Sequence, residues 1–329
     1  MKKALIFISL FSLILCSLCF SDDKTIFVVE SYHTEYPWDI SYKKGIESIL
    51  GKDYTLVYFQ MDTKRLPVEQ FEHRAQLAFE MYKKINPILV MLGDDNALKF
   101  LGPKFSKTKT PVVYFGINNN PRDYNVTHYD NITGVLERPL SIPSIVYLND
   151  IIEPKLEKLL ILFDSGISSK AAIQVMFSDR TSVKLANIQI DLKLIGDFSE
   201  WKKTISDAQK NGYGAVILGL YHTIVDENKK HVSHNQVIEW TSINTPVPSF
   251  GFWDFSVGAD KMIGGRVTTG FSQGEEAAKM AKEILGGKKI SQISPVMEKK
   301  NRFLFSRSQL KKWKITLPEN ISSKADFIE

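Results

Sequence analysis

The chain is nearly free of cysteine. Cys16 and Cys19 are the only two among 329 residues, and both lie in an apolar stretch near the amino terminus. Two lysines precede that stretch, and small residues stand at Cys19 and Ser21, so residues 1–21 have the form of a secretory signal peptide. Cleavage after Ser21 would leave an exported protein with no disulfide, no thiolate metal site and no cysteine nucleophile.

Long apolar runs are also missing beyond the amino terminus. A membrane-spanning helix needs roughly 20 consecutive apolar residues, and no later segment has them. A lipid anchor is disfavoured, because Leu15 and Leu18 precede the two cysteines where a small residue would be expected. We therefore predict a periplasmic protein that is cleaved after Ser21 and carries no acyl chain.

A large excess of charge is absent as well. The formal net charge is +5, which is too mild to indicate a nucleic-acid partner. The zinc motif H-E-x-x-H, the G-x-S-x-G elbow, the phosphate-binding P-loop and the G-x-G-x-x-G fingerprint do not occur. His231 and His234 have a usable helical spacing for a metal, but the lysines beside them favour a solvated loop. We predict no catalytic residue, no metal and no cofactor.

What the chain does have is a repeated unit of buried strand, polar or aromatic loop and amphipathic helix. Continuous apolar runs are typical of strands buried in a parallel sheet. They predict strands at 25–29, 54–59, 88–92, 111–115, 159–163, 188–194 and 215–220, with a short one reaching Phe250. Helical spacing predicts helices at 38–50, from 67, 96–102, 142–152, 169–181, 199–210, 235–243 and 276–285.

This alternation, at about 150 residues per domain, predicts an α/β protein with two doubly wound parallel-sheet lobes. We assign 22–136 plus 252–288 to the first lobe and 137–251 plus 289–318 to the second, with 319–329 as a polar tail that frays. Glycine and aromatic residues at 251–258 suit a hinge. Ser272 and Glu275 form a capping box for the last long helix.

Several stretches, in order along almost the whole chain after the signal segment, resemble the type I periplasmic binding fold. They are 31–38, 93–97, 115–119, 132–137, 257–260 and 264–274. The resemblance is to the branch of ABC-importer substrate-binding proteins that also supplies sensor modules of two-component systems. It implies two lobes joined by three hinge crossings that close on a ligand. One departure is Asp94 and Asp95, where relatives that take up aromatic amino acids have small hydroxyl residues.

Ligands of open α/β sheets bind beyond the carboxyl ends of the strands. The ligand-binding candidates lie there or at a predicted crossing. They are Ser31, Tyr32, His33, Tyr36, Trp38, Asp94, Asp95, Asn96, Asn118, Glu137, Tyr221, Trp253 and Asp254.

Some of these candidates have a second interpretation. The aromatic loop at 32–38 can contact a flat or cationic ligand, or it can simply pack against the next helix. Asp94 and Asp95 can pair with an ammonium group, act as acid and base, or cap the following helix. We favour one as the cap and the other as a ligand acceptor.

The leading hypothesis is therefore an extracytoplasmic receptor that captures a small polar molecule, with aromatic and cationic ligands as candidates, and delivers it to an ABC permease. The alternative is a ligand sensor that regulates a membrane histidine kinase. An enzyme is the third hypothesis. We expect a monomer.

Overall fold

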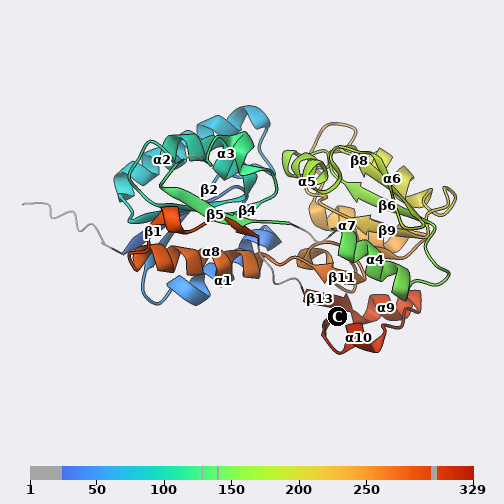
Figure 1. Ribbon diagram of the computed structural model, residues 1–329. Coiled ribbons are helices and arrows are strands. Elements are labelled where there is room, and N and C mark those ends of the chain that lie inside the picture. Colours follow the sequence, from blue (N-terminus) through green and yellow to red (C-terminus); the bar gives the residue numbers. More distant parts are fainter. Residues whose placement is uncertain (1–23, 128, 139–140, 298–301) are drawn as a thin grey trace, which may run out of the picture.

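The computed structural model describes residues 24–127, 129–138, 141–297 and 302–329. The predicted signal peptide and its cleavage after Ser21 fall outside these residues. The described chain forms two α/β lobes side by side and a smaller third sheet under the second lobe (Figure 1). The predicted fold class is thus present.

The first lobe contains a six-stranded sheet in the order β12-β5-β4-β3-β1-β2, with every neighbouring pair parallel. All residues of β1, β3 and β4 are buried, because helices cover both faces of the sheet (Figure 1). The strands are β1 (Thr25–Glu30), β2 (Thr55–Gln60), β3 (Leu89–Gly93), β4 (Val112–Ile117), β5 (Ile132–Leu136) and β12 (Val296–Met297). The helices are α1 (Pro37–Leu50) and α8 (Gly270–Leu285) on one face, and α2 (Phe71–Ile85) and α3 (Asp94–Phe105) on the other.

Helices α1 and α8 approach each other so closely that the contact requires glycine. A Cβ atom added to Gly274 would lie 2.1 Å from the carbonyl oxygen of Tyr42, and one added to Gly45 would lie 2.1 Å from that of Phe271. Real side chains cannot occupy such positions, so these two glycines let the backbones pack directly. The contact ties α8 to the first lobe.

The second lobe contains a five-stranded sheet in the order β10-β9-β6-β8-β7. Its strands are parallel except β7, an edge strand that pairs antiparallel with β8. The strands are β6 (Lys158–Phe163), β7 (Ser182–Leu185), β8 (Ile188–Leu194), β9 (Ala215–Leu218) and β10 (Ser249–Gly251). The helices are α4 (Ser141–Ile151), α5 (Ile167–Phe177), α6 (Phe198–Ser206) and α7 (His234–Asn244). Strand β7 was not predicted, because none of its residues is fully buried.

The third sheet joins β11 (Gly264–Val267), β13 (Arg302–Ser306) and β14 (Ala325–Ile328). It continues from the second lobe, since the Ile263 N–H donates to the Ser249 carbonyl (2.9 Å). Two short helices, α9 (Arg307–Trp313) and α10 (Glu319–Ser322), lie between its last two strands. Four 3-10 turns complete the described structure: η1 (Val68–Gln70), η2 (Pro121–Tyr124), η3 (Asp254–Ser256) and η4 (Ile290–Gln292).

Four predictions differ from the structure. The tail 319–329 is ordered, because β14 pairs with β13. The second crossing follows β11 and does not lie at 251–258, so the first lobe resumes only with α8, not at 252. Strand β12, predicted in the second lobe, pairs with β5 of the first. Helix α8 is capped by Thr269, whose side chain accepts from the Ser272 N–H (3.1 Å), and starts before the predicted capping box. Pairing between distant segments decides such positions, and local patterns do not reveal it.

Candidate functional site

The loop between β1 and α1 is buried where the two lobes meet. Tyr32, Tyr36 and Trp38 are 4%, 2% and 2% exposed. The ring of Tyr36 stands edge-on to that of Tyr32 (4.9 Å between centroids) and to that of His222 from the second lobe (4.7 Å). Edge-to-face contacts of this kind fix ring orientation. The aromatic loop therefore forms one wall of the region between the lobes.

Asp94 lies against this wall at the carboxyl end of β3. The indole Nε1–H of Trp38 donates to Asp94 Oδ1 (3.0 Å), while Oδ2 is buried and has no partner among the described residues. The Asp94 backbone has a φ of 67°, a left-handed conformation that is strained for aspartate and common at functional sites. Burial, reinforced by the carboxylates of Asp39 and Glu137, raises the pKa of Asp94 well above its usual range. A hydrogen-bond donor or a cation placed against Oδ2 would offset this burial and favour the ionised carboxylate.

A second carboxyl group, Glu137, stands at the first crossing between the lobes. It accepts from Asn118 Nδ2 (3.0 Å) and from the indole of Trp253, which follows β10 of the second lobe. Burial raises the pKa of Glu137 to about 8, with the neighbouring carboxylate of Asp95 adding to the rise and the indole hydrogen bond opposing it. This chain of three side chains links the ends of β4 and β10.

These groups enclose a small cavity between the lobes, of about 10 Å³. Its lining residues are Tyr32, Tyr36, Trp38, Asp94, Asn118, Glu137, Leu220, Trp253 and Phe255. Such a volume holds about one water molecule. Nothing larger than a water molecule fits this cavity with the side chains in these positions.

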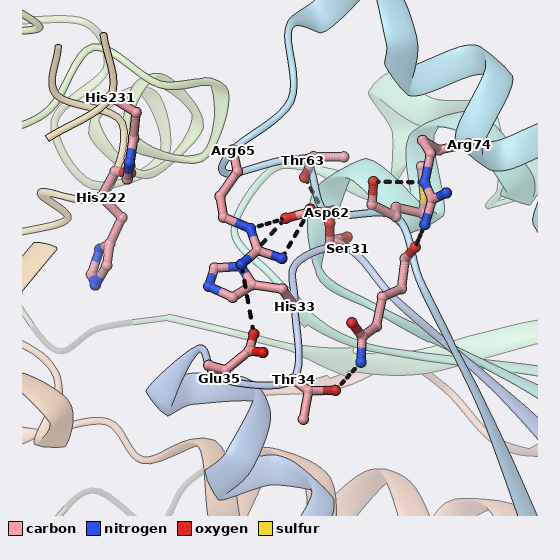
Figure 2. A network of polar contacts seen from close by, with 12 residues as sticks. Ser31, His33, Thr34, Glu35, Asp62, Thr63, Arg65, Arg74, His222 and His231 are labelled. Carbon is pink, nitrogen blue, oxygen red and sulfur yellow. Dashed lines mark hydrogen bonds and ion pairs between the residues drawn. The ribbon is translucent and has the colours of Figure 1, made fainter. Parts of the chain in front are cut away.

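Two larger cavities open from the same region. One, of about 490 Å³, is lined by both lobes, with Tyr32, Lys64 and Asn96 on one side and Ser168, Thr223 and His231 on the other. The other, of about 300 Å³, is lined by His33, Tyr36, Lys64, Arg65, His222, His231, Ser233 and His234. Figure 2 shows Arg65 turned toward Asp62 and Glu35, with His222 and His231 lying to one side of it on the second lobe.

The four histidines around this smaller cavity show no metal geometry. No group of three or more His, Cys, Asp or Glu side chains suited to an ion occurs within 24–127, 129–138, 141–297 and 302–329. Burial lowers the pKa of His222 well below its usual range and that of His234 to about 4. Neutral imidazoles suit this cavity, because Lys64 and Arg65 already place positive charge on its lining.

Asp95 has a structural role that the sequence left open. Its two oxygens accept from the backbone N–H groups of Asn118 (3.2 Å) and Asn119 (3.0 Å) and from the hydroxyl of Tyr124 (3.0 Å). All of its partners belong to the segment after β4, so Asp95 holds that segment in place. Neither Asp94 nor Asp95 caps α3, whose N-cap residue, Gly93, makes no side-chain cap hydrogen bond. The predicted capping role was therefore wrong.

Two further candidates form hydrogen bonds that join the elements around the site. The Ser31 hydroxyl donates to the Gly93 carbonyl (2.6 Å) and accepts from the Ala97 N–H (2.8 Å), so it joins β1 to the start of α3. Asn96 Nδ2 donates to Thr63 Oγ1 (2.8 Å), although its Oδ1 is buried without a partner in the described chain. Ser31 lines none of the three cavities, whereas Asn96 reaches the largest.

The remaining candidates divide between the cavities and the surrounding core. His33 lines the smaller open cavity, with Nδ1 3.6 Å from an oxygen of Asp62. Tyr221 is buried and stacks on His222 (4.3 Å between centroids), but it lines none of the three cavities. Asp254 begins the turn η3 and also lies outside them.

Residues 109–328, more than half of the chain, match the family of ABC transporter substrate binding proteins. The chain belongs to this family. Substrate-binding proteins of this family act outside the cytoplasm. In this one, no helix within the described residues is both long and apolar enough to cross a membrane.

Solved structures share the fold of this substrate-binding protein at low sequence identity. An ABC domain from Streptococcus pneumoniae in complex with L-Trp has a TM-score of 0.67 at 13% identity, over 93% of this chain and 100% of that one. A ligand-free, open substrate binding protein with adhesive properties from Clostridium difficile has a TM-score of 0.64 at 11% identity, over 93% and 99%. A TorS sensor domain–TorT complex without ligand has a TM-score of 0.55 at 11% identity, over 91% and 95%. Comparison with curated proteins gives no match.

Sequence reasoning missed several residues that line the cavities of this substrate-binding protein. They include Lys64, Arg65, Ser168, Leu220 and Phe255. Lys64 and Arg65 follow β2, so the rule that polar residues past a strand's carboxyl end face the cleft would have found them. The signal was weak, because β2 is an edge strand and none of its residues is fully buried.

Proposed function

We propose that this protein captures a small polar molecule between its two lobes, with a hydrogen-bond donor or cationic group of the ligand against Asp94, and delivers it to an ABC permease. The ligand would enter an open form, and the lobes would then close on it. The proposal includes export, with cleavage after Ser21 and no acyl chain, and a monomeric protein. Intact-mass measurement of the exported protein checks the processing, and a lipid-modified Cys16 or Cys19 would show it to be wrong.

The observation that carries the proposal is the buried, unpartnered Oδ2 of Asp94. Leaving a buried acceptor without a donor costs about 1–3 kcal/mol, more when the group is charged. Tyr36 and Trp38 from one lobe and Trp253 and Phe255 from the other line the same cavity. A group that satisfied Asp94 there would touch both lobes and would favour closure by its differential affinity for the closed form.

The Asp94→Asn variant should weaken ligand binding roughly ten- to a hundredfold, the equivalent of about 1.5–3 kcal/mol for a hydrogen bond to a charged group. Asparagine keeps an oxygen for the Trp38 indole but removes the negative charge. The unfolding free energy should stay equal or rise, because the variant no longer buries a carboxyl group whose pKa is raised. Thermal-shift screening against amino acids, nucleosides, sugars and short peptides supplies the ligand, and calorimetry measures both affinities.

Asp123→Asn is the matched control, since Asp123 is exposed on the turn η2. It should bind the ligand as the unchanged protein does. Equal affinity of Asp94→Asn and the unchanged protein would remove Asp94 from the site. If no ligand class raised the melting temperature, and scattering never detected a change between open and closed lobes, the receptor proposal would fail.

A sensor role is the second candidate, favoured by the similarity to the TorS sensor domain–TorT complex. In this case the closed form would dock onto a membrane histidine kinase in place of a permease. Both roles use the same cleft and the same closure. A permease and ATPase gene pair beside the gene would support uptake, whereas a lone histidine-kinase gene would support signalling.

A further inference from the structure

Lys64 is a buried lysine with no direct ion pair in the described part of the chain, although its charge opposes the rise in the pKa of two buried carboxyl groups, Asp39 and Asp94. It follows β2 and is only 8% exposed, and among the described residues it has no hydrogen bond and no ion pair within 4.0 Å. Its Nζ lies 4.5 Å from the centre of the Tyr32 ring and 5.6 Å from that of Tyr36. Cation–π contacts contribute about 0.5–2 kcal/mol, whereas burying an ammonium group costs several kcal/mol. The two rings therefore offset only part of the free-energy cost of burying the ammonium group.

Across the large cavity, Lys64 faces the amino-terminal end of helix α5. Helix α5 begins at Ile167, and its N-cap residue Gly166 makes no side-chain cap hydrogen bond. The first backbone N–H groups of a helix lack intrahelical partners and carry partial positive charge, which suits an anion. A hydrogen bond between Tyr32 and Ser168 (3.1 Å between hydroxyl oxygens) holds this helix end beside the first lobe.

The charged residues that line this cavity also favour an anion. Lys64, Arg65, Lys170 and Lys229 line the 490 Å³ cavity, and no aspartate or glutamate of the described chain does. Arg65 is neutralised by Asp62 (2.7 Å and 3.0 Å). Asp164 is the acid close to the α5 end, but both of its oxygens are occupied, by the N–H groups of Gly166, His222 and Thr223 and by the hydroxyl of Ser169. These hydrogen bonds hold Asp164 in place but do not cancel a negative charge, so the positive field in the cavity comes mainly from Lys64, Lys170 and Lys229.

We propose that the ligand carries an oxyanion group, a carboxylate or a phosphate, which binds between the Lys64 ammonium and the amino-terminal end of α5. The inference rests on the proposed function, because it places this group on the ligand that the lobes enclose. A ligand so held has a hydrogen-bond donor or cationic group toward Asp94 and an anionic group toward Lys64. Because Lys64 and α5 belong to different lobes, the oxyanion would also favour the closed form.

Inorganic phosphate and acetate, each titrated at constant ionic strength into the exported protein, test the oxyanion site. The melting temperature should rise saturably with at least one of them. In Lys64→Met, which has a side chain of similar length and no charge, the apparent affinity should fall at least tenfold. Lys107→Met, on an exposed loop after α3, is the matched control and should respond as the unchanged protein does. A response to phosphate alone indicates a phosphate ligand, and a response to acetate alone indicates a carboxylate.

Equal anion affinity in Lys64→Met, or no saturable response of the unchanged protein to either anion, would overturn the inference. Should Lys64→Met fail to fold, Lys64→Arg and Lys64→Gln give the same comparison, and only the arginine variant should retain binding. A screened ligand that closes the lobes of Lys64→Met with unchanged affinity also overturns the inference but leaves the proposed function standing. Anion binding through Lys64 without ligand-driven closure would contradict the proposed function alone.

Discussion

Replacing Asp95 with alanine should lower the free energy of unfolding by about 2–4 kcal/mol, because each buried donor left without an acceptor costs about 1–3 kcal/mol. Three donors lose their acceptor: the N–H groups of Asn118 and Asn119 and the hydroxyl of Tyr124. Part of this cost is offset, since burial raises the pKa of Asp95 and its ionised form is itself destabilising. Urea unfolding followed by circular dichroism measures the difference.

Asp123→Ala is the control for this experiment, because it removes an exposed carboxylate beside Tyr124. It should change the unfolding free energy by less than about 0.5 kcal/mol. If Asp95→Ala were as stable as the unchanged protein but bound ligand poorly, Asp95 would be a ligand group, and the structural role described above would be wrong.

The Glu137→Gln variant should lose a large part of the pH dependence of stability. An unfolded glutamate titrates near pH 4.5, whereas the pKa of Glu137 in the folded protein is about 8. Between these values the folded protein holds a proton that the unfolded chain has released, so stability falls as the pH rises through this interval. The full interval corresponds to about 5 kcal/mol at about 1.4 kcal/mol per pKa unit, as an upper estimate. Below pH 4.5 and above pH 8 this group contributes no slope.

Glutamine is neutral at every pH, and the Asn118 amide can rotate so that its unpartnered Oδ1 accepts from it. Urea unfolding at intervals from pH 5 to 8.5 should therefore give a flatter profile for Glu137→Gln. Some slope remains, because burial also raises the pKa of Asp94, and that of Asp254 to about 6. Glu157→Gln, at an exposed position, should keep the profile of the unchanged protein. An identical slope in Glu137→Gln would show that Glu137 titrates normally.

The sequence predicted the lobes because their central strands are continuous apolar runs. Residues 88–92 lie almost wholly within β3, and 111–115 overlaps most of β4. Such runs are buried only when helices cover both faces of the sheet, and this arrangement is typical of an α/β fold. Strand β14 of the third sheet carries no comparable signal, since it alternates between exposed and half-buried residues and pairs with a strand about twenty residues away.

Several candidates chosen at strand ends lie together in the structure. Trp38, Asp94, Asn118, Glu137 and Trp253 come from separate segments and line one cavity. The different roles of Asp94 and Asp95 could not be predicted, because adjacent residues at a helix start point in different directions. Only the tertiary positions of Trp38 and Tyr124 show which carboxyl group faces the cavity and which holds the loop.

A crystal structure of the protein with a ligand from the thermal-shift screen tests the central claim most directly. We expect the ligand between the lobes, with a donor group within hydrogen-bond distance of Asp94 Oδ2 and with Tyr36, Trp38 and Trp253 against it. A rival position is a cavity of about 460 Å³ on the second lobe, beside Ile173, Arg180 and Leu192. A ligand bound there, with Asp94 untouched and the lobes unmoved, would contradict the account.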